Sequence, residues 1–195
     1  MTTQTKEYTK EERLAFFTDE LNLIQDENIR NFTEDILSKL PNYYFDIQAS
    51  STGKYHPTLA QGEQGLIRHT ISAVNIGYDL ATRNDMFKSC KEYSDYVVSA
   101  LILHDGCKCG RTYQKYTKTE HPLLVCDLIR ENYKDTDSEL ICSLISSHMG
   151  QWNYDYKSKK EVLPKPQNVL QSLVHLADYL ASRRYLDFNF EKKNG

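Results

Sequence analysis

The sequence has 195 residues, of which 39% are hydrophobic and 26% are charged, with 8 glycines and 5 prolines. These fractions exclude collagen-like, low-complexity and wholly disordered chains, and the length fits a single domain over residues 1–195. The formal net charge of −3 argues against a protein whose main task is to bind long duplex nucleic acid, because such proteins present a strongly basic face. A small anionic substrate stays possible, since a few cations in one cleft would attract it.

The hydrophobic periodicity is helical almost throughout the chain. In chain order it predicts helices over residues 10–24, 29–40, 65–82, 91–104, 122–132, 136–149 and 167–186. Pro41 ends the second of these helices, and Pro122 suits the first turn of the fifth. Residues 42–64 form a predicted loop rich in Ser, Thr and Gly. No strand, repeat or linker is predicted, so the fold class is all-α, a single helical bundle with N-terminal helices over 1–41 and a core over 65–187.

Local signals mark several helix ends. Thr9 with Glu12 predicts a capping box at the start of the first helix, and Thr136 with Glu139 predicts a second one at the sixth. Gly150 is the predicted stop of that sixth helix.

Two features of the sequence bear on its location. No apolar run approaches the ~20 residues of a membrane span, and the polar N-terminus MTTQTKEYTKEE does not resemble a signal peptide. The 5 cysteines are odd in number and scattered through predicted helices, which favours reduced thiols. We therefore expect a cytoplasmic protein with no membrane partner.

Four predicted helices each place an imidazole or a carboxylate on the core-facing side. A lone histidine on an apolar face is more often a core residue than a metal ligand. A buried carboxylate without a cation, however, costs on the order of several kcal/mol. A bound metal would explain the inward groups together, and mixed imidazole and carboxylate ligands favour Mn, Fe, Co, Ni or Zn. Structural zinc is disfavoured, because Cys107 and Cys109 form only a CxC with no second cysteine pair. The inward groups are those of His69, His104, Asp105, His148 and Asp178.

The strings LIRHT, ALILHDGCK and HLADYL carry a resemblance to a known family. In this order they resemble the H…HD…D pattern of the HD superfamily of metal-dependent phosphohydrolases, often with a lysine three positions after the HD aspartate. The matching residues here are His69, His104, Asp105, Lys108 and Asp178. The resemblance implies an all-α HD domain that hydrolyses phosphate esters with a metal-activated water.

Two further histidines, in EHP and SSHMG, refine the resemblance. His121 and His148 occupy the intervals used by HD subfamilies with two metals, such as cyclic dinucleotide phosphodiesterases and the HD domain of bacterial 3′–5′ exoribonucleases. The string GCKCG departs from the commoner IGK continuation. The resemblance implies two divalent transition-metal ions bridged by Asp105. One ion would be held by His69, His104, Asp105 and Asp178, and the other by Asp105, His121 and His148.

The resemblance also implies roles for the catalytic residues. Asp105 would hold the metals, and Lys108 could donate to a phosphoryl oxygen, unless it is a solvated loop lysine. His175, one turn before Asp178, is expected to pack or to orient a ligand rather than to bind metal. The substrate would be a nucleotide or a short single strand. The alternatives are a mononuclear dNTP phosphatase and a non-catalytic regulatory module that keeps the HD scaffold.

The predicted loop ASSTGKYHP lies just before the first ligand helix and offers hydroxyls, a cation and an imidazole. It lacks the spacing of a P-loop, so it could form a wall of the substrate cleft or be an ordinary loop. After His148, Trp152, Tyr154 and Tyr156 could stack on a base or pack at the surface. Oligomeric state is left open. The candidate substrate-binding residues are Ser51, Thr52, Lys54, His56, Arg68 and Lys115.

Overall fold

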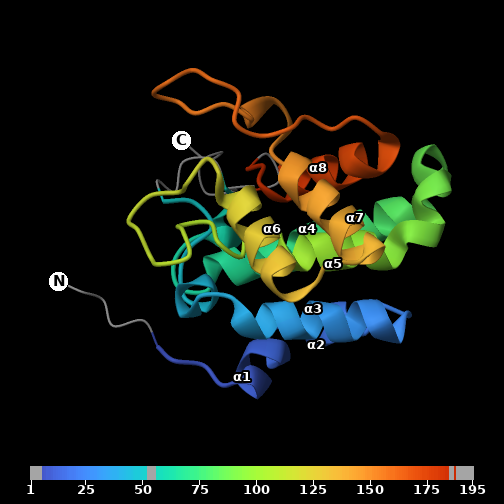
Figure 1. Cartoon of the computed structure of the whole chain (residues 1–195), viewed down its shortest axis with the longest axis horizontal. Helices are drawn as coiled ribbons and strands as arrows, with labels where there is room; N and C mark the ends of the chain where they lie inside the picture. The colour runs from blue at the N-terminus through green and yellow to red at the C-terminus, as the bar shows by residue number, and fades with distance from the viewer. Residues whose placement is uncertain (1–5, 52–55, 185–186, 188–195) are drawn as a thin grey trace, which may run out of the picture.

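The structure is a computed structural model that describes residues 6–51, 56–184 and 187. Within these residues the fold is all-α, as predicted, and only an isolated bridge between Tyr154 and Glu161 has β geometry. The α-helices are α1 (Lys10–Ala15), α2 (Thr18–Leu21), α3 (Glu27–Lys39), α4 (Gly65–Arg83), α5 (Ser94–Leu103), α6 (His121–Asn132), α7 (Thr136–Ser147) and α8 (Val169–Ala181) (Figure 1). Short 3₁₀ turns connect them: η1 (Asn42–Phe45), η2 (Thr58–Ala60), η3 (Asp85–Tyr93) and η4 (Gly150–Trp152).

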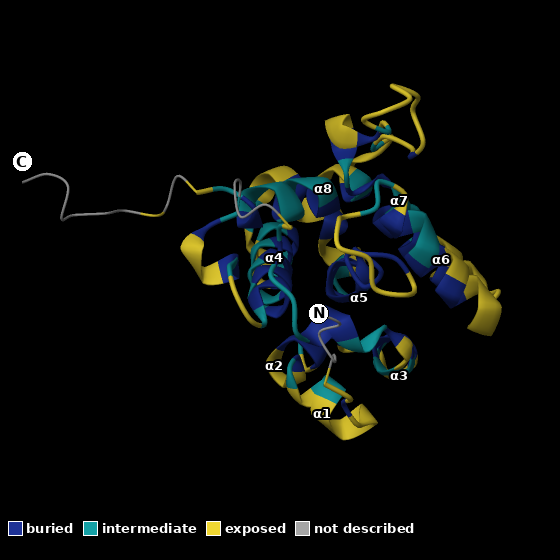
Figure 2. Cartoon of the chain, turned by 90° about the vertical axis from the view of Figure 1, so that its left-hand side faces the viewer, coloured by how far each residue is buried: buried dark blue, intermediate teal, exposed yellow. Residues whose placement is uncertain are grey.

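Helix α5 is the centre of the bundle. Its residues from Val97 to Leu103 are all buried, and it contacts α3, α4, α7 and α8 (Figure 2). A helix that is apolar on every side can be stable only when other elements enclose it. The sequence VVSALIL therefore places the end of α5, and the residues that follow it, in the interior.

Helices α4 and α5 approach each other closely at Gly77. A Cβ atom at this position would lie 2.3 Å from Cδ1 of Leu101 and 3.3 Å from Cγ1 of Val97. The missing side chain lets the two backbones come together, so that α4, which carries His69, lies against the helix that precedes His104 and Asp105.

The turn after α5 is held by two tyrosines of η1. The hydroxyl of Tyr44 donates to the carbonyl of Ile102 at 2.9 Å, and that of Tyr43 donates to the carbonyl of Gly110 at 2.6 Å. The Tyr43 oxygen also accepts the amide of Cys109 at 3.0 Å. Residues 42–64, predicted to be a loop, thus supply the buried polar contacts that shape the segment after α5.

The structure confirms some predicted helix ends and corrects others. The capping box of Thr9 and Glu12 is present. The second predicted box is wrong, because Asp135 is the N-cap of α7 and accepts the amide of Ser138 at 2.8 Å. A carboxylate at this position both caps the helix and suits the positive end of its dipole. Glu139 pairs instead with Arg130.

Three predicted helices have different lengths in the structure. The first is split into α1 and α2 at Phe17, which leaves helical geometry with φ −127° and ψ 23° and is fully buried. The fourth begins only at Ser94, after the 3₁₀ turns of η3. The last is shorter than predicted and ends at Ala181.

All five cysteines are buried and have free thiols. No helix among the described residues is long and apolar enough to cross a bilayer.

Candidate metal centre

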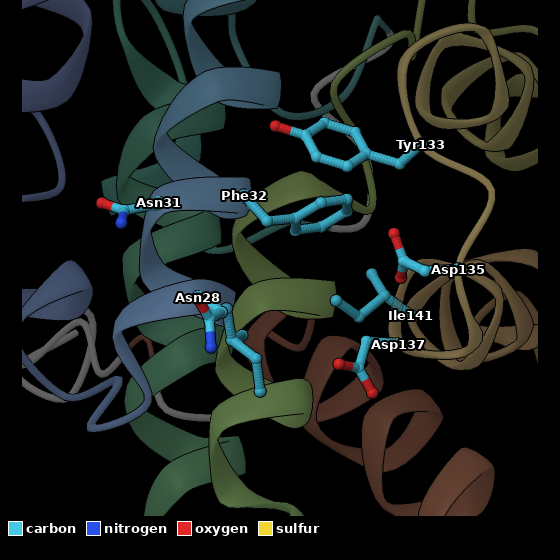
Figure 3. A pocket seen from close by; sticks show the side chains of 8 residues that line it. Asn28, Asn31, Phe32, Tyr133, Asp135, Asp137 and Ile141 are labelled. Atoms are coloured by element: carbon cyan, nitrogen blue, oxygen red, sulfur yellow. The ribbon is translucent and has the colours of Figure 1, made fainter.

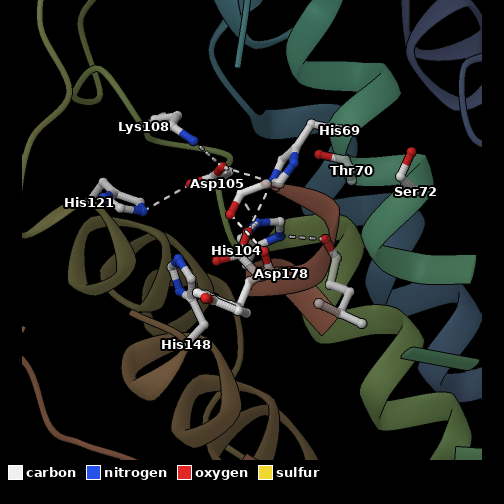
Figure 4. A network of polar contacts seen from close by, with 12 residues as sticks. His69, Thr70, Ser72, His104, Asp105, Lys108, His121, His148 and Asp178 are labelled. Carbon is white, nitrogen blue, oxygen red and sulfur yellow. Dashed lines mark hydrogen bonds and ion pairs between the residues drawn. The ribbon is translucent and has the colours of Figure 1, made fainter. Parts of the chain in front are cut away.

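The six metal-ligand candidates meet in one cluster, although up to 109 positions separate them along the chain. They come from five helices or helix ends, and Figure 4 shows their side chains converging. His69 lies on α4 and Asp178 on α8, His104 and Asp105 follow the last residue of α5, His121 begins α6, and His148 caps α7.

Asp105 lies at the middle of the cluster, and its two oxygens face different partners. Oδ1 lies 2.9 Å from Nε2 of His121. Oδ2 lies 3.4 Å from Nε2 of His104, 3.8 Å from Nε2 of His69 and 2.5 Å from Nζ of Lys108. The surrounding groups therefore form two sets, and each set faces one oxygen of this carboxylate.

Asp178 closes one side of the cluster. Its Oδ1 lies 2.9 Å from Nε2 of His69 and 3.5 Å from Nε2 of His104. Its side chain is 19% exposed, whereas that of Asp105 is 2% exposed. The cluster is thus deeply buried at Asp105 and opens toward solvent at Asp178.

Three of the histidines are fixed by the same backbone contact. In each, Nδ1 lies within hydrogen-bond distance of the carbonyl three residues earlier. Because a carbonyl only accepts, Nδ1 carries the hydrogen, and in the neutral ring Nε2 keeps a lone pair aimed at the cluster. The pairs are His104 with Leu101 at 2.7 Å, His121 with Lys118 at 2.7 Å, and His148 with Ile145 at 2.8 Å.

The cluster fits a divalent metal. With the ring hydrogen on Nδ1, the buried Nε2 atoms of His104 and His121 face carboxylate oxygens, which also only accept. Neither atom therefore has a hydrogen-bond partner among the described residues, and this is costly unless a cation lies between the facing atoms. Three sets of ligand atoms each lie within 4.8 Å of one another. These sets are His69, His104 and Asp105; His104, His148 and Asp178; and Asp105, His121 and His148.

The pKa shifts show that the two carboxylates attract positive charge at His104. Burial would lower the pKa of His104, but the charges of Asp105 and Asp178 outweigh it and raise that pKa to about 10. Burial would raise the pKa of Asp105, but Lys108 and His104 hold it well below its usual range. Burial, with His104 next in size, lowers the pKa of His148 to about 3. Burial would also raise the pKa of Asp178, but His104 and His69 hold it well below its usual range. Two carboxylates thus stay ionised, as metal ligands must.

Comparison with known protein families now identifies the chain. The HD domain family matches residues 66–183, a span that contains all six ligand candidates. The chain belongs to the HD domain family. As a superfamily, HD domains are metal-dependent phosphohydrolases that bind divalent metals, so the family and the geometry agree on the coarse chemistry. Comparisons with curated proteins and with solved structures found no match.

Four of the six ligand candidates line a cavity of about 510 Å³. Asp105, His121, His148 and Asp178 form one side, so a ligand in the cavity can reach the cluster. Lys108 also lines it and is only 9% exposed, which excludes a solvated loop lysine. A second cavity, of about 200 Å³, shares Ala49, Lys108 and Thr117 with the first.

The candidate substrate-binding residues are distributed unevenly. His56 lines the larger cavity, and its ring lies 4.9 Å from that of His69. Ser51 and Lys115 line the smaller one. Arg68 instead bonds to the carbonyls of Leu59, Gln61 and Glu63 and so holds the chain before α4. Thr52 and Lys54 lie outside the described residues.

Some lining residues were not found from the sequence. Ser182 and Arg183, at the end of α8, and Met149, after α7, line the larger cavity. Ser182 follows Asp178 by four positions and so shares its helix face, which was a usable signal. Met149 adjoins His148, but nothing in its residue type points to a site.

A further cavity, of about 270 Å³, lies at the opposite end of α7 from His148 (Figure 3). At 1.5 Å per residue the 12-residue helix separates the two ends by about 18 Å. The two carboxylates that line this cavity have structural roles. Asp135 caps α7, and Asp137 accepts a hydrogen bond from the hydroxyl of Tyr96 at 2.8 Å. This cavity is therefore distinct from the metal centre.

Proposed function

We propose that the protein is a phosphohydrolase that cleaves a phosphate ester of a nucleotide or of a short single-stranded nucleic acid, with two divalent transition-metal ions. The observation that carries this proposal is the meeting of six His and Asp ligand candidates in one cluster, four of which line a single cavity together with Lys108. The proposal places one ion with His69, His104, Asp105 and Asp178, and the other with Asp105, His121 and His148.

The two-ion arrangement is supported by Asp105. Its oxygens face His121 on one side and His104 on the other, as a bridging carboxylate requires. When bound, a pair of divalent ions would lower the pKa of water and neutralise charge on the phosphate oxygens.

The chain's own residues supply binding and charge. The ammonium of Lys108 lies 2.5 Å from Oδ2 of Asp105 and faces both cavities, where it could donate to a phosphoryl oxygen. His56, on the wall of the larger cavity, keeps a buried Nδ1 without a hydrogen-bond partner among the described residues. A phosphate or sugar hydroxyl could satisfy this atom, so His56 is assigned to substrate binding.

The shape of the site favours small or single-stranded substrates. The ligand candidates are buried or nearly so, and a rigid duplex could not bring its backbone to them without unpairing. The net charge of −3 also gives little long-range attraction for a polyanion.

The test is hydrolysis by the full chain loaded in turn with Mn, Ni, Co, Zn and Mg. The substrates are mononucleotides, cyclic dinucleotides, short single strands and matched blunt duplexes. We expect metal-dependent release of product from single-stranded or small substrates, lost on chelation and on replacing Asp105→Ala. Efficient cleavage of duplex over the small substrates, or metal binding without hydrolysis of any of these esters, would contradict the proposal.

A further inference from the structure

The larger cavity has an aromatic wall beside the metal ligands. The segment after His148 contributes Trp152, Tyr154 and Tyr156 to its lining, and these rings are 39%, 40% and 76% exposed. Large exposed aromatic side chains on a cavity wall are available to a ligand in that cavity.

The indole of Trp152 is held in a fixed orientation. It stacks on Tyr179 of α8 with ring centroids 5.7 Å apart and an interplanar angle of 15°. The guanidinium of Arg183 lies 4.5 Å from the Tyr179 ring and 5.7 Å from the Trp152 ring. Because these contacts already restrict the indole, a ligand that stacks on its exposed part would lose little side-chain entropy on binding.

The turn that connects this indole to His148 is also held in place. Trp152 ends the turn η4, which begins two residues after the ligand His148. His175 holds the turn in place, because its Nδ1 donates to the carbonyl of His148 at 2.7 Å and its ring packs 6.3 Å from that of Trp152. Gly150 lies against this ring, since a Cβ there would come within 2.3 Å of Cε1 of His175.

We propose that Trp152 is a base-binding platform, on which a nucleobase stacks while the attached phosphate lies at the histidine–aspartate cluster. This inference rests on the proposed function. It restricts the substrate to one that carries an unpaired base, because only an unpaired base exposes a face for stacking. Stacking on an aromatic side chain tolerates any base. Arg183, which lines the same cavity beside the platform, provides a positive charge that suits an anionic ligand. The cavity volume of about 510 Å³ lies within the usual range for small-molecule sites.

The chain offers a direct optical test, because Trp152 is its single tryptophan. The full chain loaded with zinc, whose filled d shell has no redox chemistry, is titrated with adenosine 5′-monophosphate and with ribose 5-phosphate. Both probes contain the sugar phosphate, but only adenosine 5′-monophosphate carries a base. Indole fluorescence is read directly after mixing. We expect saturable quenching by adenosine 5′-monophosphate and none by ribose 5-phosphate.

Calorimetry on variants gives a second readout. Trp152→Ala should weaken binding of adenosine 5′-monophosphate by roughly 5- to 150-fold, the range of single-base stacking, and should leave ribose 5-phosphate unaffected. Trp152→Phe should retain most of the affinity. Tyr93→Ala is the matched control, since Tyr93 is also exposed but lies on η3 and does not line the cavity.

Equal quenching by the two probes, absence of saturable quenching by adenosine 5′-monophosphate, or full affinity in Trp152→Ala would overturn the platform. Base-dependent quenching in a chain that hydrolyses no nucleotide ester would support the platform and contradict the proposed function. Hydrolysis of a nucleotide ester without base-dependent quenching would support the proposed function and contradict the platform.

Discussion

The imidazole of His175 donates its Nδ1 hydrogen to the carbonyl oxygen of His148, 2.7 Å away. His175 belongs to none of the three groups of ligand atoms, and its hydrogen bond holds the backbone of a residue that does, in agreement with the expectation that it packs or orients. The same His148 has its own Nδ1 on the carbonyl of Ile145 at 2.8 Å. Both its ring and its backbone are thus fixed by hydrogen bonds.

Replacing His175→Ala should weaken metal binding at the set that contains His148. Loss of an outer hydrogen bond to a ligand costs 10- to 100-fold in metal affinity in comparable sites, and we expect about 10-fold, because His175 bonds to the backbone and not to the ring. Metal titration of the metal-free chain by calorimetry measures this change. Gln171→Ala is the matched control, since Gln171 also reaches from α8 to a carbonyl of α7, that of Ser143 at 3.3 Å. Equal affinities in the two variants would show that His175 only packs.

Two ions per chain are expected at full loading, and His121 and Asp105 should differ in their effect on that number. His121→Ala removes a group that faces only Oδ1 of Asp105, so one ion should be lost. Asp105→Ala removes the carboxylate between both sets, so both ions should be lost. Elemental analysis after gel filtration counts the ions, and circular dichroism verifies that the variants fold. A wild-type maximum of one ion, unchanged in His121→Ala, would contradict the two-ion proposal.

Lys108→Met should retain the metals but lower turnover. Loss of one donor to a developing phosphoryl charge reduces the rate on the order of 10²-fold. Lys108→Met also removes the partner of a carboxylate whose side chain is 2% exposed. In the metal-free chain that loss should destabilise the fold by about 3–5 kcal/mol, and by less once bound cations neutralise Asp105.

Turnover, metal content and urea unfolding with and without metal test this prediction. Lys134→Met, at an exposed position between α6 and α7, is the control for loss of a lysine. Wild-type turnover in Lys108→Met would leave Lys108 with a structural role as the partner of Asp105.

The sequence predicted the all-α fold, because apolar spacing along a buried helix is a strong signal. The same spacing identified five of the six ligand candidates as inward-facing groups, and all six are buried or nearly so in one cluster. His121 was the exception, since it begins α6 and was recognised only through the family resemblance.

Contacts made by irregular segments could not be predicted from periodicity. Arg68 was a candidate for substrate binding, yet its guanidinium bonds to three carbonyls of the chain before α4. The hydroxyls of Tyr43 and Tyr44 bond to the carbonyls of Gly110 and Ile102, which lie 67 and 58 positions away along the chain. Residue spacing does not reveal hydrogen bonds between segments so far apart.

The carboxyl of Glu20 gives a prediction for pH dependence that is separate from the metal centre. Glu20 lies on α2, is 6% exposed, and accepts a hydrogen bond from Nδ2 of Asn75 at 3.3 Å. Burial raises its pKa above the ordinary 4.5, although its own backbone amide and Asn75 partly oppose the shift. The folded state therefore holds this proton more tightly than the unfolded state does.

The sign of the effect follows from proton linkage. Where the folded state binds more protons, stability falls as the pH rises. The stabilisation from protonated Glu20 is fully present below the unfolded pKa and is lost as the pH rises through the folded one. Glu20→Gln keeps the size of the side chain and an oxygen for Asn75 but cannot ionise. We expect this variant to be more stable than the wild type at pH 7 and no more stable at pH 4.

Urea unfolding of the wild type and of Glu20→Gln between pH 4 and pH 8 measures the difference in their stability. Groups that titrate in the same way in both proteins cancel in this difference. Glu27→Gln is the control, because Glu27 is exposed in the first turn of α3, where a carboxylate is favoured by the helix dipole. That variant should gain no stability at pH 7. A Glu20→Gln advantage that is the same at pH 4 and pH 7 would mean that the buried charge is not its cause.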